Sequence, residues 1–312
     1  MNRVSTSGMF NSAVLAINNA QNRLTTAGQQ ANTGKLANDL SGYGANTEQI
    51  TAAQSLQSRL KSHIEAGKVL ASKLDLQDQT LQTVAKAAGD AHQAISQALA
   101  AGDGSSLVTQ LQAALSTSVT ALNTQFNGQY LYAGSQTGTA PVAASSLADL
   151  TAAGAIGNVF KNDQLATVSR IDDHTLTTTG QLASTVATPL FTALQQVEAF
   201  NQGPNGPITG QLTPAQTTFL QGIVAQFTTA QTQATSIAVQ NGAAQNQLTT
   251  TTDILSNQSD ALTGTLSNLT DVDEAKAASD LQLAQFALQA SAQVFSTLKN
   301  SSLLNLLPNT FN

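Results

Sequence analysis

Cysteine and tryptophan are absent from this chain of 312 residues, and only 4% of its residues are aromatic. Without cysteine there are no disulfide bonds and no thiol nucleophile. Charged residues make up 10% of the sequence, against roughly 25% in ordinary soluble domains. No run approaches the roughly 20 apolar residues that span a bilayer, so we expect no membrane insertion. The N-terminal segment has no apolar core followed by a small-residue cleavage site. These features predict either a cytoplasmic protein or one exported without a cleaved signal.

The few charges are unevenly distributed. The net charge is −6, and the twelve basic residues are scattered, so nucleic-acid binding is not expected. Two long segments, 104–148 and 199–252, contain no charged residue at all. Their polar positions are amides and hydroxyls, which avoid the repulsion between like charges that stacked identical copies would suffer. The pattern therefore indicates an assembly subunit, with a low-charge extracellular protein as the alternative.

The C-terminal stretch carries a coiled-coil pattern. Its apolar positions alternate at spacings of three and four residues, which predicts a helix with a narrow apolar stripe that needs a partner helix. Three acidic residues at 271–274 suit a helix N-terminus and Lys299 suits the C-terminal end, after which Pro308 ends the pattern. The stripe consists of Leu281, Ala284, Leu288, Ser291, Phe295 and Leu298.

The same pattern occurs near the N-terminus, at Phe10, Ala13, Ile17, Ala20, Leu24, Ala27 and Ala31. We therefore predict that the two ends pair as one domain, residues 1–45 with 268–312. Two helices with many small residues bury little apolar area, so we expect this pair to order only when neighbouring molecules pack around it. Periodicity alone equally allows an ordinary helical hairpin that closes a globular domain.

Two long helices are predicted inside these ends. One runs from about Glu48 to Ala100, after Thr47 as N-cap, with a seven-residue apolar ladder. The other runs from Pro214 to about Asn268. Because their lengths match, we predict an antiparallel bundle of residues 46–128 and 206–267, joined by a third helix over 106–126 that ends at Asn127-Gly128.

The centre, residues 129–205, is predicted to be a small β-rich insertion. Strands are expected over 129–135, 165–170 and 175–179, followed by a short helix that begins at Pro189. The cluster Asp172-Asp173-His174 is interpreted as the cap of a hairpin rather than as a metal or acid–base site. His63 and His92 lack a second ligand at helical spacing. The sequence thus predicts no catalytic residue, no metal site and no cofactor.

Several short motifs together suggest a family. They are Arg3-Val4-Ser5-Thr6-Ser7, Thr33-Gly34-Lys35, the segment 128–136 (GQYLYAGSQ), Asp271-Val272-Asp273, Gln289-Ala290-Ser291 and the segment 302–307 (SLLNLL). On these motifs the chain resembles the flagellin superfamily, and within it the family of hook-associated protein 3, which joins hook to filament. The connector Leu40-Ser41-Gly42-Tyr43-Gly44 departs from the run rich in aspartate and proline that the family often has there.

The resemblance implies a mainly α fold: a flagellin-like rod with paired terminal coiled-coil helices, a long antiparallel bundle and a variable central insertion. It implies export through the flagellar type III apparatus to the extracellular flagellum. The implied partners are identical subunits in a ring, a neighbouring hook-associated protein, flagellin, and an export chaperone on the C-terminal helix at Leu281, Leu288 and Phe295. The assembly interface would be the helix seams at Phe10, Ile17, Leu24, Leu281, Leu288, Phe295 and Leu298.

Two other functions remain open at this stage. The chain could be a filament flagellin, or a surface-displayed homologue whose tip binds a ligand such as a polysaccharide. An enzyme in the segment 128–205 is disfavoured, because the segment has no paired carboxylates, no Ser/His/Asp spacing and no glycine-rich phosphate loop.

Overall fold

The structure is a computed structural model that describes the backbone of residues 2–304 and the side chains of residues 8–300. Its contacts divide the chain into two compact units, residues 1–60 with 257–312 and residues 61–256. This differs from the three parts predicted, because the central segment groups with the long helices. Each unit is described by itself.

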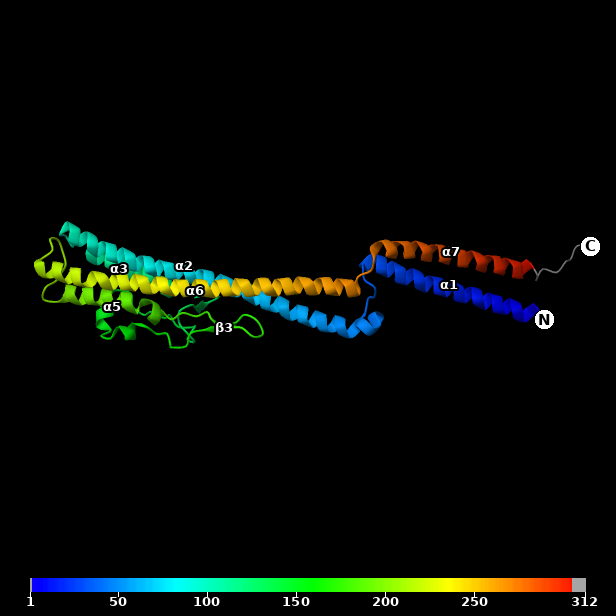
Figure 1. Cartoon of the computed structure of the whole chain (residues 1–312), viewed down its shortest axis with the longest axis horizontal. Coiled ribbons are helices and arrows are strands. Elements are labelled where there is room, and N and C mark those ends of the chain that lie inside the picture. The colour runs from blue at the N-terminus through cyan, green and yellow to red at the C-terminus, as the bar shows by residue number, and fades with distance from the viewer. Residues whose placement is uncertain (1, 305–312) are drawn as a thin grey trace, which may run out of the picture. The chain divides into compact units, whose positions relative to one another are not determined.

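Two long antiparallel helices, α2 (Thr47–Ala101) and α6 (Pro214–Thr270), provide the frame of the 61–256 unit (Figure 1). Both helices were predicted to within two residues at each end. The apolar ladder of α2 is buried throughout, at Leu60, Gly67, Leu74, Leu81, Ala88 and Ile95. Gly67 belongs to this ladder because a Cβ there would lie 3.0 Å from Thr252 Oγ1 on α6. The predicted antiparallel pairing of the two rods is confirmed.

Two shorter helices complete the core of this unit. They are α3 (Leu107–Leu122) and α5 (Ala183–Gln202), which lie beside the long helices in Figure 1. Phe191 on α5 and Phe227 on α6 are fully buried in one common cluster with Leu115 on α3. The predicted start of the helix at Pro189 is wrong, since α5 begins at Ala183 and contains Pro189 in its interior. Burial of the apolar face of α5 in this core outweighs the helix-breaking tendency of proline.

The segment after α3 forms a tight hairpin rather than a helix end. Strands β1 (Gln125–Phe126) and β2 (Gln129–Tyr130) pair antiparallel across Asn127-Gly128, where both residues have positive φ. Asn-Gly is the preferred pair for such a two-residue turn. Our assignment of Asn127-Gly128 to the end of the third helix was therefore wrong, as was the extension of the strand to residue 135.

Tyr132 explains why the strand stops at Tyr130. The chain turns inward there, and the Tyr132 side chain is completely buried against α2. Its hydroxyl lies 2.5 Å from Thr80 Oγ1 and donates to the Gln77 carbonyl at 3.0 Å. Burial raises the pKa of the Tyr132 hydroxyl well above its usual value. The buried phenol is thus neutral and anchors the loop to α2.

The rest of the central segment holds α4 (Leu147–Ala152), the short 3₁₀ helix η2 (Ile156–Val159) and a hairpin of β3 (Val168–Arg170) with β4 (Leu176–Thr178). The expected cap at Asp172 is confirmed, because its carboxylate accepts from the backbone amides of His174 and Thr175. These bonds lower the pKa of Asp172, with the His174 amide as the largest cause. Ile171 packs against Leu74, Ala244 and Leu248, which fixes the hairpin on the long helices.

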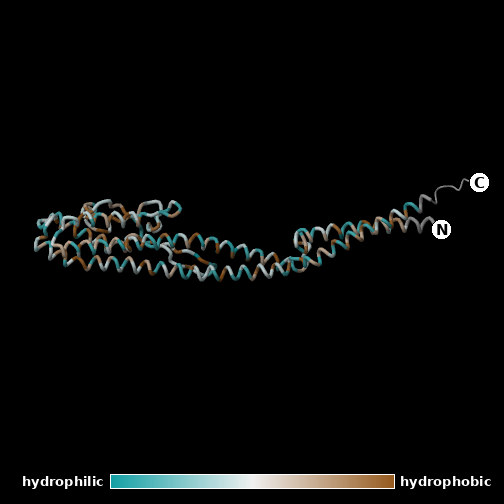
Figure 2. Tube along the Cα trace, turned by 90° about the horizontal axis from the view of Figure 1, so that it is seen from above, coloured by the Kyte–Doolittle hydropathy of each residue, from teal (hydrophilic) through white to brown (hydrophobic). Residues whose placement is uncertain are grey.

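The other unit contains the terminal helices α1 (Asn2–Thr33) and α7 (Glu274–Leu304), the 3₁₀ segment η1 (Leu40–Asn46), the start of α2 and the end of α6. The helices α1 and α7 lie side by side (Figure 1), as predicted. Apolar and polar residues alternate along both helices (Figure 2), so neither presents a continuous apolar run. The predicted helix stop at Pro308 and the motif residues 305–307 lie outside the described residues.

Candidate assembly interface on the terminal helices

The seam between α1 and α7 is built mainly from alanine. Ala13, Ala20 and Ala27 on α1 and Ala277 and Ala284 on α7 are each less than 8% exposed. Small side chains let the two helix axes approach closely, but they bury little apolar surface. The seam is therefore well matched in shape and weak in hydrophobic stabilisation.

Larger side chains flank the alanines on both helices. Ile17 and Leu24 on α1 and Leu281 and Leu288 on α7 are half-buried. Leu281 Cδ1 lies 3.9 Å from the position of a Cβ added at Gly28, and the rings of Phe10 and Phe295 have centroids 4.8 Å apart. These two contacts show that the helices run antiparallel. They leave Phe10 40% exposed.

All seven residues predicted for the seam lie on the α1/α7 pair, and they share one face of each helix. Six are half-buried, while Phe10 is exposed except for its contact with Phe295. The half-buried residues are Ile17, Leu24, Leu281, Leu288, Phe295 and Leu298. Whether this face also contacts other molecules remains a prediction.

A second apolar row on α7 was missed by the sequence analysis. Leu283, Phe286 and Val294 are 62%, 68% and 54% exposed, and Ala290 lies between the last two. We call these four residues the outer stripe. Their spacings of three and four residues repeat the coiled-coil pattern on a different side of the helix from the seam. This second row was the signal available in the sequence.

A groove of about 480 Å³ runs along the same side of the helix pair. It is lined from α7 by Asp280, Leu283 and Ala287, and from α1 by Arg23 and Thr26, among others. Its wall therefore combines apolar groups with one charge of each sign.

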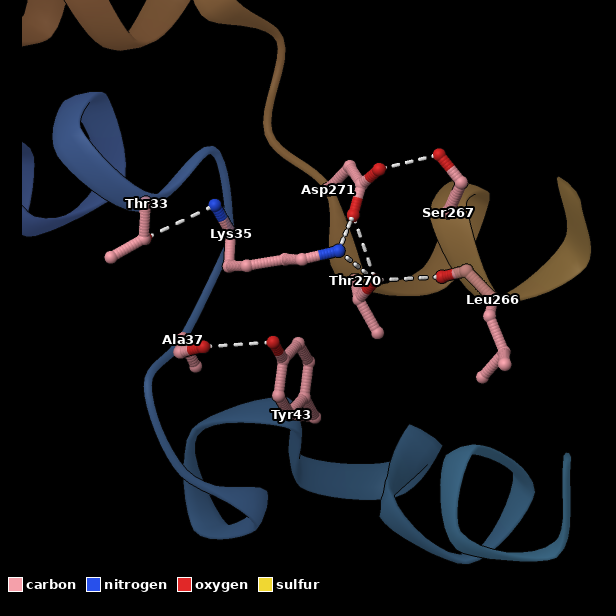
Figure 3. Close-up of polar contacts among 8 residues, drawn as sticks. All are labelled: Thr33, Lys35, Ala37, Tyr43, Leu266, Ser267, Thr270 and Asp271. Atoms are coloured by element: carbon pink, nitrogen blue, oxygen red, sulfur yellow. Dashed lines mark hydrogen bonds and ion pairs between the residues drawn. The ribbon is translucent and has the colours of Figure 1, made fainter. Parts of the chain in front are cut away.

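The connectors between the helices are joined by a set of bonds that we call the connector clasp (Figure 3). Leu36 N donates to the Thr270 carbonyl at 2.8 Å, and Val272 N donates to the Gly34 carbonyl at 2.9 Å. Lys35 Nζ pairs with Asp271 Oδ1 and donates to Thr270 Oγ1 at 3.3 Å. Two segments 235 residues apart in sequence are thereby held together where α1 and α6 end.

Glycine and aspartate make this geometry possible. Gly34 follows α1 with φ of +68° and donates its amide to the Gln30 carbonyl at 2.9 Å, which is the usual left-handed end of a helix. Asp271 also accepts from the hydroxyl of Ser267 and lies 2.8 Å from that of Thr270. Lys35 first, then Ser267 and Thr270, lower the pKa of Asp271 to about 2. The carboxylate is therefore ionised under all ordinary conditions.

Of the histidines on α2, His63 makes a polar contact with another element. His63 Nε2 lies 3.1 Å from Asp173 Oδ1 at the tip of the β3–β4 hairpin, a contact that helical spacing on α2 could not reveal. Within the described side chains, no group of three histidine, aspartate or glutamate residues could hold a metal ion. None of the described helices is both long and apolar enough to cross a membrane.

Comparison with known proteins gives two family matches and several structural ones. The bacterial flagellin N-terminal helical region matches residues 4–137, and the bacterial flagellin C-terminal helical region matches residues 224–307. Among curated protein sequences, none matches this chain.

Two solved structures share the fold. One is described as a putative flagellar hook-associated protein from Vibrio parahaemolyticus, with a TM-score of 0.58 and 14% identity over 74% of this chain and 100% of its own. The other is FlgL from Bacillus cereus, with a TM-score of 0.54 and 16% identity over 70% of this chain and 98% of its own. Since the two flagellin regions match both ends of the chain and most of its length, it belongs to the flagellin superfamily of structural components of the bacterial flagellum.

Proposed function

We propose that this chain is the structural subunit that joins the flagellar hook to the filament, and that it self-assembles through α1 and α7. The observation that carries the proposal is the terminal helix pair, which has an alanine seam and an exposed outer stripe within the two matched flagellin regions. Both related structures, one described as a hook-associated protein and the other as FlgL, share the fold and favour a junction role over a filament role.

The proposed partners are identical subunits in a ring, a neighbouring hook-associated protein and flagellin. An export chaperone would bind α7 before secretion at Leu281, Leu288 and Phe295. These three side chains are half-buried on the side that faces α1. Binding there consequently requires α1 to separate from α7, which a seam of small residues permits at little cost.

Deletion of the gene tests the junction role. We expect cells to make hooks without filaments and to release flagellin into the medium, because flagellin would have no platform on which to assemble. In wild-type flagella the protein should be a minor component, in an amount that fits one ring per filament. A major band that makes up the filament would contradict the junction role and identify a filament flagellin. Normal filaments in the deletion strain would point to a surface-displayed homologue.

The terminal helices are expected to gain their full order only on assembly. In limited proteolysis of the purified monomer, we expect early loss of about residues 1–45 and 268–312 and survival of a fragment around the common core of α2, α3, α5 and α6. The reason is that the α1/α7 seam buries mostly alanine, whereas that core buries large aliphatic and aromatic side chains. Mass spectrometry of the fragments makes the measurement. Equal resistance of the ends and the core would show a finished domain in the monomer.

A further inference from the structure

Two exposed apolar surfaces lie on opposite sides of the α1/α7 pair. The first is the outer stripe of α7, which lies beside the groove lined by Arg23. The second is formed by Phe10 and Val14 of α1, which are 40% and 37% exposed. We call it the rear patch. Val14 and Arg23 are nine positions apart, which is two and a half helical turns, so their side chains point in opposite directions. The rear patch therefore faces away from the groove.

The two surfaces also lie at the same height along the pair. The ring of Phe10 contacts the ring of Phe295 across the seam, with the two planes tilted by 48°. One turn further along α1 is Val14, and one turn back along the antiparallel α7 is Ser291. Val14 consequently lies level with Ala290 and Val294 of the outer stripe, on the other side of the molecule.

The charges around the rear patch favour burial against an apolar neighbour. Between Phe10 and Asn22, α1 contains no charged residue. The flank of α7 beside the rear patch carries amides such as Gln285 and Gln289, and the exposed Lys299, one turn past Phe295, has a long side chain that can keep its charge in solvent. Packing this side of one molecule against the outer stripe of another would bury no unpaired charge from α1, so the desolvation cost of the contact is low.

We propose that the rear patch of one copy of this chain packs against the outer stripe of the next copy, with Phe10 and Val14 seated on Ala290 and Val294. The contact is head-to-tail, because the two surfaces differ and face opposite directions. Repeated head-to-tail contacts generate a closed ring or a helical array rather than a symmetric dimer. This inference rests on the proposed function and specifies which faces of the terminal helices meet.

Because the chain contains no cysteine, a pair of introduced cysteines can test the proposed contact directly. A chain carrying both Val14→Cys and Ala290→Cys should form a ladder of disulfide-linked species in flagella isolated from cells that express it. Each single variant should remain monomeric on a non-reducing gel, because identical positions do not meet in a head-to-tail contact. The matched control is Val14→Cys with Gln289→Cys, which moves the second thiol by one residue to the opposite flank of α7 and should give no ladder.

Each alternative gives a different experimental result. Dimers of the Val14→Cys single variant would show a symmetric contact and overturn the proposal. A double variant that is incorporated into flagella without cross-linking, or a ladder in the Gln289 control, would refute the assignment of faces while the proposed function stands. Absence of the wild-type chain from flagella would refute the proposed function and this inference with it.

Discussion

Replacement of Leu288 by aspartate is expected to abolish assembly while leaving the helical bundle folded. Leu288 is half-buried in the alanine seam of α7, on the side that faces α1. A carboxylate there must either lose its water or separate the two helices. If each subunit contact must supply about 2 kcal/mol more to hold the altered α1/α7 pair together, each association constant falls about 30-fold. Since a ring repeats the contact, the losses multiply and no closed assembly forms.

The bundle should not respond to this change. Its core is a cluster of buried residues between Leu81 and Ile237, none of which lies in α1 or α7. We therefore expect thermal unfolding of the Leu288→Asp monomer, followed by circular dichroism at the main transition, to match the wild type. Phe295→Asp should behave in the same way, because it removes the ring contact with Phe10.

The matched control is Gln282→Asp, which adds the same charge at an exposed position of α7, six residues from Leu288 and away from the contact proposed at Ala290 and Val294. This variant should assemble as the wild-type chain does, with at most a small loss of affinity. Filaments attached normally in cells that carry Leu288→Asp would show that the seam does not take part in assembly. A lowered main unfolding transition would instead show that the seam stabilises the monomer's bundle.

The long helices could be predicted because several independent signals agreed. The seven-residue ladder marked the buried face of α2, and the pair Thr213-Pro214 marked the start of α6. In the structure these helices run from Thr47 and from Pro214 to within two residues of the predicted ends. Within α6, Ile254 is 51% exposed, whereas its neighbour Leu255 is buried. A run of adjacent apolar residues, here Ile254-Leu255, does not by itself say which member faces the partner.

The misassigned regions are those where tertiary contacts decide the local structure. Proline is typical of a helix start, so Pro189 was assigned there. Burial of the apolar face of α5 extends the helix back to Ala183. The segment after Tyr130 reads as a strand, but the buried hydroxyl contacts of Tyr132 turn it inward. Neither the partner helix nor the pocket for the tyrosine can be seen in the local sequence.

The candidate interface was predicted in part. The seam follows from one helical period, and the structure places its residues on facing sides of α1 and α7. The outer stripe was missed because Leu283, Phe286 and Val294 form a second apolar row on the same helix. The sequence analysis considered one apolar row on this helix. The connector clasp was also missed, although Thr33-Gly34-Lys35 and Asp271 had been noted as motifs, because their pairing over more than 200 residues has no sequence signature.

The clasp itself leads to a prediction at the connectors. Replacement of Asp271 by alanine should increase the hydrogen-exchange rates of the Leu36 and Val272 amides about tenfold, measured by mass spectrometry on the purified chain. These amides form the two backbone bonds between the connectors, and Asp271 holds Lys35, Ser267 and Thr270 around them. Asp280→Ala is the matched control, since it removes an exposed carboxylate of α7 that lies outside the clasp. Equal exchange in the two variants would show that the backbone bonds suffice without the carboxylate.

The same clasp should open in acid, and the sign follows from the depressed pKa of Asp271. This pKa is about 2 in the folded chain, against an ordinary value of 3.8. A carboxyl group with a lowered folded pKa contributes stability that is fully present above the ordinary value and is lost as the pH falls through the folded value. Protection of the Leu36 and Val272 amides, corrected for intrinsic exchange, should thus be constant above about pH 4.5 and decline from there toward pH 2. In Asp271→Asn, which cannot titrate, the decline should be absent. An identical decline in that variant would assign the acid sensitivity to another group, such as Asp39 on the same connector, whose pKa is lowered mainly by its hydrogen bond from Ser41.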